Sequence, residues 1–339
     1  METADLDYDL PAEAIAQHPI EPRDAARLLV AGEGRTPEHR TVADLPDLVE
    51  PGSVVVVNDT RVIPARLALR KPTGGAVEVL LLDRRPEGDW EALVKPSRRV
   101  ADGTVLTPAE AGDLRVTVGE VLGDDGRRRV TVDGDIDAVG EVPLPPYIHE
   151  ALDDPERYQT VYARTPGSVA APTAGLHLTS RVLDRLAAQG THVLRVELVV
   201  GLGTFRPITA AKVDDHAMHG ERYRIPEATQ AALAGDHGPV VAIGTTVVRA
   251  LESWAATGEA TGTTELFIHG DYPFALVDRL LTNFHVPRSS LLAMVEAFAG
   301  SGWRDWYRLA LAEGYRFLSF GDAMLLDRRE PPLDRREIP

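Results

Sequence analysis

The sequence predicts an α/β protein in which an α/β domain with a mixed or parallel sheet is interrupted by a small antiparallel β-barrel domain. Two observations support this prediction. Near-continuous apolar runs such as "SVVVVNDT" alternate with amphipathic helical stretches, which is typical of strands covered by helices on both faces. One internal block instead contains short strand-like runs separated by Gly, Asp and Pro turns. With 339 residues, the chain is long enough for two domains.

The predicted barrel occupies residues 71–146. Its strand-like runs include "GGAVEVLLLDRR", "DWEALVKP", "LRVTVGEVLG" and "RRRVTVDGD". The block begins at the turn Lys71-Pro72-Thr73-Gly74-Gly75 and ends at the proline-rich "VPLPPYI". We therefore expect a discontinuous α/β domain made of residues 1–70 and 147–339, with the barrel inserted between its two parts.

The α/β domain is expected to contain four buried strands and at least three helices. The apolar runs that predict the strands are Ser53–Thr60, Thr191–Phe205, Gly238–Thr246 and Ala275–Phe284. Helices are expected at Arg181–Gln189, Val247–Ala256 and Ser290–Ala299. The first of these helices has a candidate N-cap in Thr179 or Ser180.

Composition excludes several classes of site. The chain has no cysteine, so disulfides, thiolate catalysis and cysteine-based metal sites are ruled out. The N-terminus lacks a basic end followed by an apolar run, and no segment approaches the ~20 apolar residues of a membrane span. We therefore expect a cytoplasmic protein without a membrane partner.

The formal net charge of −16 argues against a protein that coats nucleic acid without specificity, because phosphate contacts need Lys and Arg. A local basic face is still compatible with this charge. Three segments are candidates for one, although each also fits a solvated turn or chain end: "KPSRR" (Lys95–Arg99), "GRRRV" (Gly126–Val130) and the tail "LDRREPPLDRREIP".

Each apolar run ends in a short polar signature: Asn58-Asp59-Thr60-Arg61, Gly201-Leu202-Gly203-Thr204-Phe205, Gly244-Thr245-Thr246 and Thr282-Asn283-Phe284-His285. Ligands of open α/β sheets bind at the carboxyl ends of strands, so these signatures predict a site. At the start of a helix, Gly-Thr-Thr could hold a carboxylate or ribose oxygens. The alternative is that Thr246 is only an N-cap and that Arg249 pairs outward.

The stretch "GSVAAPTAGLHLT", which leads to His177, has almost no side chains before its imidazole. Such residues bury little apolar area, so a ligand approaching the backbone closely is one explanation. A tight strand-to-helix connection is the other. His285 also lies in a loop that follows a strand, where imidazoles often meet ligands, although a structural histidine is the ordinary expectation for both.

The segment "DDHAMHGE" places His216, His219 and Glu221 near one another. No helix-borne H-E-x-x-H pattern accompanies them, so acid–base or hydrogen-bonding roles are favoured over metal binding.

Arg61, Arg66 and Arg249 are candidate anion clamps, because a guanidinium can grip a carboxylate or phosphate in two places. The alternative is that they form ion pairs with acidic residues of the same chain, for which the candidates are Asp59, Asp278 and Glu252.

Other enzyme classes lack their motifs in this chain. There is no G-x-S-x-G elbow and no Walker loop, which removes serine hydrolases and P-loop nucleotidases. "VGLGTF" resembles only half of a dinucleotide fingerprint. The residues alone therefore indicate an α/β enzyme that binds a small polar, nucleoside-like ligand.

Ten motifs in order along almost the whole chain resemble the S-adenosylmethionine:tRNA ribosyltransferase-isomerase family of queuosine biosynthesis. They are "NDTRVIPARL", "LPPYI", "YQTVYA", "GSVAAPTAGLH", "GLGTF.P", "DH.MH.E", "GTT.VR.LES", "LLTNFH.P.S.L", "AFAG" and "YRF.S.GDAM". The resemblance implies an α/β domain interrupted by a small β-barrel, which agrees with the fold predicted above.

The resemblance also implies an activity. The ribosyl part of S-adenosylmethionine (AdoMet) would move to 7-aminomethyl-7-deazaguanine at the tRNA wobble position, giving epoxyqueuosine, adenine and methionine. AdoMet would be a co-substrate, and tRNA would be the partner. No metal would be needed, and the protein would be a monomer or a homodimer. A sulfonium acidifies the adjacent 5′ C–H, so histidines suit the base that takes this proton and the acid that helps adenine to leave.

The strand-end pattern and the resemblance together predict the site. The expected catalytic residues are His177, His216, His219, Glu221 and His285. The expected substrate-binding residues are Asn58, Asp59, Arg61, Arg66, Tyr147, Tyr162, Ala171, Thr173, Ala174, Gly175, Gly201, Gly203, Thr204, Phe205, Gly244, Thr245, Thr246, Arg249, Asn283, Phe284, Ser289 and Asp322. In this hypothesis Ala170 to Gly175 forms a backbone wall for a heterocycle or the ribosyl group, and His177 faces the reacting sugar.

Three positions depart from the family pattern: Val199 replaces a histidine, and Gly220 and Val247 replace serines. The usual "YPGY" region reads Ile268-His269-Gly270-Asp271-Tyr272. One alternative is therefore a divergent paralogue that uses AdoMet with a small-molecule acceptor. Another is a noncatalytic tRNA-binding module, which the surviving polar loops disfavour.

Overall fold

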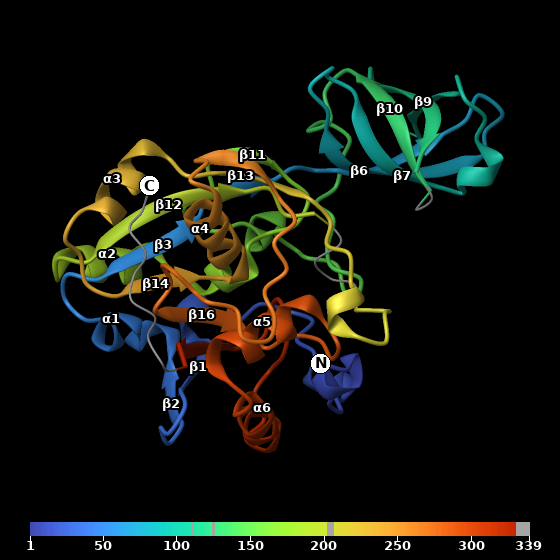
Figure 1. Cartoon of the computed structure of the whole chain (residues 1–339). Coiled ribbons are helices and arrows are strands. Elements are labelled where there is room, and N and C mark those ends of the chain that lie inside the picture. The colour runs from blue at the N-terminus through green and yellow to red at the C-terminus, as the bar shows by residue number, and fades with distance from the viewer. Residues whose placement is uncertain (110–111, 124–125, 202–206, 330–339) are drawn as a thin grey trace. The chain divides into compact units, whose positions relative to one another are not determined.

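A computed structural model describes residues 1–109, 112–123, 126–201 and 207–329 of the chain (Figure 1). It divides into two compact units. The first contains Met1–Thr60, Pro145–Thr165 and the chain from Ala171 onward, and the second contains Arg61–Leu144 and Pro166–Ala170. The predicted fold class, an α/β domain interrupted by an antiparallel barrel, is confirmed.

The first unit is built on a mixed sheet with the strand order β15-β13-β12-β3-β14-β16-β17-β1-β2 in the described part of the chain. The strands are β1 (Arg27–Ala31), β2 (Glu38–Thr41), β3 (Val54–Asn58), β12 (His192–Leu198), β13 (Glu221–Arg224), β14 (Val240–Ile243), β15 (Thr261–Thr264), β16 (Arg279–Asn283) and β17 (Ala323–Asp327). The neighbours β12, β3, β14 and β16 all run parallel. Their carboxyl ends therefore lie along one edge of the sheet.

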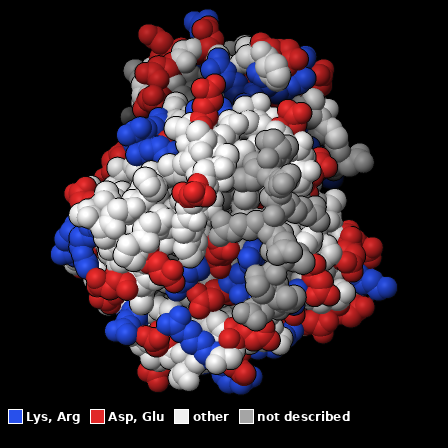
Figure 2. Space-filling model, turned by 60° about the vertical axis from the view of Figure 1, so that its left-hand side comes forward, with Lys and Arg blue, Asp and Glu red and all other residues white. Residues whose placement is uncertain are grey.

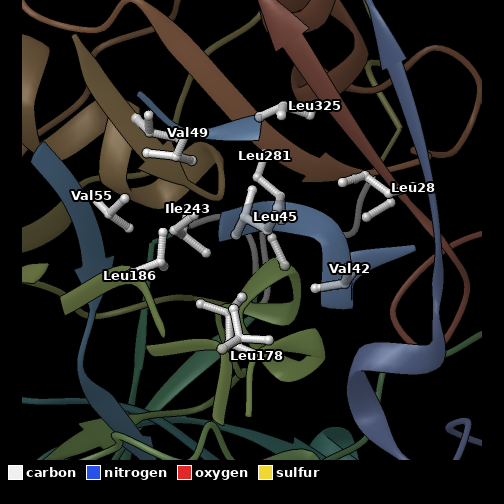
Figure 3. Close-up of a cluster of buried hydrophobic side chains, with 14 of the residues drawn as sticks. Leu28, Val42, Leu45, Val49, Val55, Leu178, Leu186, Ile243, Leu281 and Leu325 are labelled. Atoms are coloured by element: carbon white, nitrogen blue, oxygen red, sulfur yellow. The ribbon is translucent and has the colours of Figure 1, made fainter. Parts of the chain in front are cut away.

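Helices cover the sheet because its central strands are apolar on both faces. All five residues of β3 are buried, including the four valines. Figure 3 shows Val55 of this strand in a cluster with residues of helices α1 (Leu45–Leu48) and α2 (Ser180–Ala188). Helix α4 (Thr245–Thr257) contacts β3, β12, β14 and β16. The other helices are α3 (Glu227–Ala234), α5 (Ser290–Ala299) and α6 (Trp303–Ala312).

The predicted helices form where the sequence placed them. Helix α5 spans the predicted residues, and α4 contains the predicted Val247–Ala256. For α2, Thr179 is the N-cap: its Oγ1 accepts a hydrogen bond from the Val182 backbone N–H at 3.3 Å. Thr179 therefore satisfies one of the N–H groups that a helix start leaves without a partner.

The second unit is a closed barrel with the strand order β10-β7-β6-β5-β8-β9. Its strands are β5 (Arg66–Arg70), β6 (Ala76–Arg84), β7 (Trp90–Lys95), β8 (Val105–Pro108), β9 (Arg115–Leu122) and β10 (Arg127–Asp133). Strands β4 (Thr60–Val62) and β11 (Thr165–Ser168) form a separate two-stranded sheet.

The barrel begins before the boundary that we expected at Lys71. Strand β5 pairs with both β6 and β8, so the barrel would not close without it. The turn Lys71-Pro72-Thr73-Gly74-Gly75 is the hairpin turn between β5 and β6, closed by the Lys71 N–H donating to the Gly75 carbonyl. A hairpin turn and a domain boundary use the same residue types, which is why the sequence did not separate them.

Charged side chains of both signs are interspersed over the face of the molecule in Figure 2. None of the helices in the described residues combines the length and the apolar character that a membrane crossing requires.

Candidate active site

A small cavity lies at the carboxyl ends of β14 and β16, and we call it the strand-end cavity. Its lining comes from these two strand ends, from the loop after β11, from the residues after β12 and from the start of α5. The lining residues are Ala171, Pro172, Thr173, Ala174, Val200, Gly244, Thr245, Thr246, Thr282, Asn283, His285 and Leu291. Polar signatures from separate apolar runs thus meet around one space.

The start of α4 presents hydroxyl groups to this cavity. The N-cap position is Gly244, whose φ of 96° is a conformation that favours glycine. Thr246 is therefore inside the helix, and the alternative in which it is the N-cap is wrong. Its Oγ1 is buried and has no hydrogen-bond partner among the described residues. A buried hydroxyl without a partner beside a cavity is a candidate ligand contact.

Asn283 connects three segments at the floor of the cavity. Its Oδ1 accepts a hydrogen bond from Thr173 Oγ1 at 2.9 Å. Its Nδ2 donates to the Leu318 carbonyl at 3.2 Å and lies 2.9 Å from Nε2 of His177. Since the amide donates, Nε2 of His177 is the unprotonated acceptor. Asn283 therefore holds both Thr173 and the imidazole in place.

His285 is held by its backbone and by its ring. Tyr8 donates a hydrogen bond to its carbonyl at 2.5 Å, and its N–H donates to the Tyr307 hydroxyl at 3.0 Å. The ring Nε2 lies 2.8 Å from Thr282 Oγ1. Burial lowers the pKa of His285 to about 3, so the ring is neutral near pH 7.

A second hollow is much larger than the strand-end cavity, and we call it the open cleft. Its lining residues are Gly201, Pro207, Thr209, Ala210, Asp215, His216, Ala217, Met218, His219, Gly220, Glu221 and Arg249. The predicted histidine pair and its carboxylate neighbour therefore lie in one cleft. The pKa of His216 is lowered by burial and by the nearby His219, which favours a neutral imidazole that can accept a proton.

Glu221 and Arg249 form a buried ion pair between the Glu221 Oε2 and the Arg249 Nη1 atoms. The remaining guanidinium donors reach the carbonyls of Thr264 at 3.2 Å and Leu266 at 3.1 Å. Glu221 Oε1 also accepts a hydrogen bond from the Gly201 N–H at 3.0 Å. Arg249 thus pairs with Glu221 rather than with Glu252, whose carboxylate accepts three backbone N–H groups of residues 275–277.

A third, small hollow lies between the other two. It shares Thr245, Thr246 and Leu291 with the strand-end cavity, and it shares Met218, Glu221 and Arg249 with the open cleft. The three hollows adjoin through these residues. The three hollows therefore form a continuous row along this edge of the sheet.

His177 adjoins the strand-end cavity through its hydrogen bond with Asn283. It lines a separate small hollow with Arg23 and Arg157, and it is not among the residues that line the strand-end cavity. Its side chain is buried, and burial, with smaller contributions from arginines that include these two, lowers its pKa to about 3. Its position supports a role in holding Asn283 instead of direct contact with a sugar in the strand-end cavity.

Gly175 has an internal reason to lack a side chain. A Cβ atom at this position would lie 2.0 Å from the hydroxyl oxygen of Tyr162. Tyr162, one of the predicted substrate contacts, is therefore packed behind the loop. Ala171 and Ala174 do line the cavity. The small residues of this loop therefore have two roles: Ala171 and Ala174 form a wall of the cavity, and Gly175 packs closely against Tyr162.

The polar residues at the end of β3, Asn58 and Asp59, bind the neighbouring strand β12. Asn58 is fully buried, and its amide exchanges hydrogen bonds with the backbone N–H and carbonyl of Leu198 on β12. Asp59 is 3.5 Å from Arg195, and burial raises its pKa. These two residues join neighbouring strands, so the structure gives them a role other than substrate contact. The candidate clamps Arg61 and Arg66 belong to the barrel unit.

Four further predicted contacts are outside the linings of these hollows. Phe284 is a fully buried aromatic, and Ser289 is the N-cap of α5. The Tyr147 hydroxyl lies 2.7 Å from Ser319 Oγ. Asp322 accepts hydrogen bonds from the backbone N–H groups of residues 27 and 316. The predicted Gly203, Thr204 and Phe205 lie outside the described residues.

Sequence reasoning missed the apolar part of the site. Leu291, Met218, Met294 and Val200 line the adjoining hollows. Leu291 and Met294 lie one helical turn apart on α5, a spacing that also fits an ordinary core stripe. Such residues carry no sequence signal that separates a pocket wall from a core.

The three departures from the family pattern have different surroundings. Val247 is fully buried in α4 and does not line any of the hollows described above, whereas Gly220 lines the open cleft. A Cβ at Gly220 would lie 2.7 Å from Thr263 Cγ2. Val199 is half-buried and donates its N–H to the Arg222 carbonyl. Within the described residues, no three His, Asp or Glu side chains converge as metal ligands.

Comparison with known proteins identifies the family. The sequence model of the family described as "Queuosine biosynthesis protein" matches residues 3–326. The chain belongs to this family. It is similar to the S-adenosylmethionine:tRNA ribosyltransferase-isomerases of Rubrobacter xylanophilus, with 51% identity over 96% of this chain and 98% of that protein, and of Thermus thermophilus, with 50% identity over 94% and 98%.

A solved structure of the family agrees with this assignment. The crystal structure of S-adenosylmethionine tRNA ribosyltransferase from Thermotoga maritima is 37% identical, covers 95% of this chain and 99% of that chain, and has a TM-score of 0.54. Queuosine-family membership is therefore supported by sequence and by fold.

Proposed function

We propose that this protein transfers and isomerises the ribosyl part of AdoMet onto 7-aminomethyl-7-deazaguanine in tRNA, as the sequence resemblance implied. The products are epoxyqueuosine in the tRNA, adenine and methionine. Relatives with about half of their residues identical over nearly the full chain carry this enzyme name. Their names favour this activity over a paralogue with a small-molecule acceptor and over a noncatalytic module.

The observation that carries the proposal is the convergence of three adjoining hollows on one edge of the sheet. In this proposal the strand-end cavity holds AdoMet. Thr245, Thr246 and Thr173 present hydroxyls that suit ribose oxygens or a carboxylate, and Ala171 and Ala174 form an apolar wall for a flat ring. The open cleft, which is much larger, would receive the tRNA base.

The proposed acid–base groups are His216 and His219, and His285, whose pKa burial lowers to about 3, is proposed as a neutral hydrogen-bonding group in the strand-end cavity. A neutral imidazole can take the acidic 5′ proton beside the sulfonium, and the protonated ring can later give a proton to the departing purine. His285 is the group with the most fixed ring, since its backbone and Nε2 are all bonded. The acceptor amine must be neutral to attack carbon, and partial desolvation in the cleft would lower its pKa.

The Glu221–Arg249 pair has a positioning role in this proposal. The pair joins β13 to α4 at the boundary between the hollows, where it lies within reach of a ligand that spans them. Because both partners are buried, removing one would leave an uncompensated charge. AdoMet is a co-substrate here, and we propose no metal, a cytoplasmic location and either a monomer or a homodimer.

The test is chromatographic detection of adenine and methionine after incubation of the protein with AdoMet. Reactions contain tRNA with the aminomethyl-deazaguanine base, tRNA with unmodified guanine, or no tRNA. We expect release only with the first tRNA, together with a modified nucleoside that carries the transferred carbon skeleton. Release without tRNA, or with a small-molecule amine alone, would overturn the tRNA acceptor and support the paralogue.

A further inference from the structure

The basic motifs of the sequence differ in how many of their charged side chains form ion pairs in the structure. In "GRRRV", all three arginines are paired within the barrel. Arg127 lies 2.5 Å from Glu91, and Arg129 lies 3.6 Å from Asp89 and 3.5 Å from Glu120. Arg128 is buried, and its Nη2 lies 2.6 Å from Asp102 Oδ1. This motif is a structural part of the barrel wall.

The C-terminal basic motif also starts in ion pairs. Arg328 lies 3.2 Å from Asp278, and Arg329 lies 2.7 Å from Asp271. Residues 330–339, which contain the rest of this motif, lie outside the described chain. Neither motif offers unpaired positive charge on the described surface.

"KPSRR" is different, because the side chains of its arginines have no partner in the described part of the chain. Arg98 and Arg99 are exposed, and their guanidinium groups form no ion pair or side-chain hydrogen bond with any residue that the structure describes. The Lys95 side chain is 77% exposed and its ammonium lies 4.0 Å from Glu78. Such a distance across solvent neutralises little of the lysine charge.

Two more basic residues lie at the same end of the barrel. Lys71 donates a hydrogen bond from Nζ to the Arg99 carbonyl at 3.0 Å, which joins the β5–β6 turn to the loop after β7. The exposed Arg70 is the last residue of β5 and pairs with Ala76, the first residue of β6. Strand β7 ends at Lys95, which pairs with Glu78 near the same start of β6.

These five residues, Arg70, Lys71, Lys95, Arg98 and Arg99, form a set that we call the barrel-rim patch. Two carboxylates of the described residues, Glu78 and Asp102, lie beside it. Glu78 is the acidic partner of Lys95 alone, and Asp102 is engaged by the buried Arg128. A rim with this excess of positive charge is distinctive on a chain whose net charge is −16.

We propose that the barrel-rim patch binds the phosphate backbone of the tRNA substrate. This inference rests on the proposed function and adds a surface for its partner on the barrel unit. Exposed guanidinium and ammonium groups without strong internal partners suit phosphates, because little internal bonding must be broken when they bind. Contacts of this kind position a nucleic acid and do not read its bases. The patch should therefore set tRNA affinity and leave the chemical step unchanged.

The experiment compares two double variants that each remove two positive charges from the barrel. R98Q/R99Q changes the patch, and R84Q/R85Q changes the opposite end of β6 and its turn, since β6 begins at Ala76 and ends at Arg84. Binding of tRNA bearing the aminomethyl-deazaguanine base is titrated between 50 and 200 mM NaCl. Adenine release is measured at saturating tRNA and AdoMet.

We expect R98Q/R99Q to raise the tRNA Kd about tenfold at 0.1 M salt and to reduce the slope of log affinity against log salt by about two. Its kcat at saturating tRNA should match that of the unaltered protein, as should the Kd of R84Q/R85Q. Equal Kd values for the two double variants would overturn the patch. Should R98Q/R99Q lose thermal stability, K95Q alone decides, with an expected rise in Kd of about threefold.

This design separates the patch from the proposed function. tRNA-dependent adenine release by the unaltered protein tests the function alone. If that release occurs while the patch variants bind tRNA as tightly as the unaltered protein, only the patch is wrong. If no tRNA supports adenine release, the proposed function is wrong and the patch loses its partner.

Discussion

Thr246 is a polar side chain whose expected role changes once its neighbours in the folded protein are known. In the sequence it fits a helix cap, and in the structure it lies inside α4 with a buried hydroxyl that has no partner in the described chain. A group of this kind is costly to bury unless something else bonds it. Its location between two adjoining hollows supports substrate contact.

We predict that Thr246→Val weakens AdoMet binding without harming the fold. The change keeps the side-chain shape and removes a hydroxyl that would bond the ligand, so KM for AdoMet should rise about tenfold. The free energy of unfolding should stay the same or increase. Thr246→Ser, which keeps the hydroxyl, is the matched control and should retain a nearly normal KM. An unchanged KM in the valine variant would exclude this contact.

Gly175 shows that an absent side chain can reflect packing. We expect Gly175→Ala to destabilise the protein by about 1–3 kcal/mol, because the new methyl would overlap the Tyr162 hydroxyl. Urea unfolding measures the loss. Tyr162→Phe removes that oxygen, so the double variant G175A/Y162F should recover part of the stability. If the two effects simply added, the Tyr162 contact would not explain the glycine.

Secondary-structure elements were predictable where local rules act. The helix Ser290–Ala299 was located from its pattern, and Ser289 and Thr179 both cap helices through side-chain oxygens. The barrel boundary was less predictable. A Pro-Gly turn looks the same whether it closes a hairpin or ends a domain, and only the pairing of β5 with β8 decides between them.

The cap of α2 gives a prediction for one element. Thr179 accepts a hydrogen bond from the Val182 N–H and donates to the buried Asp24 at 2.9 Å. Thr179→Ala should therefore lower the free energy of unfolding by about 1–2 kcal/mol, as measured by urea denaturation. Ser180→Ala is the control, because Ser180 follows the cap position. Equal losses in both variants would contradict the assigned cap.

For the molecule as a whole, two buried histidines connect stability to pH. Burial lowers the pKa of both His177 and His285 to about 3. The unfolded chain, with ordinary histidine pKa values near 6.5, takes up protons that the folded chain does not. Stability is therefore unaffected by these groups above about pH 6.5. It falls as the pH drops from there toward 3, by about 1.4 kcal/mol per pH unit for each group.

Urea unfolding at pH 7, 6 and 5 tests this prediction. In His177→Gln, the slope of the unfolding free energy against pH should be smaller than in the unaltered protein. The reason is that one fewer histidine takes up a proton when the chain unfolds. A His177→Gln slope equal to that of the unaltered protein would mean that this imidazole is protonated in the folded state.

The fold class, the helices and the strand ends could be predicted because apolar periodicity, caps and turns act between near neighbours in the chain. The family could be recognised because its motifs are short and ordered. Which polar residues face a cavity could not be predicted in this way. Arg249 pairs with Glu221 instead of Glu252, His177 lines a separate hollow and shares a hydrogen bond with Asn283, and Asn58 joins two strands. Each of these contacts joins residues from separate segments of the chain, so only the packing of the folded molecule decides them.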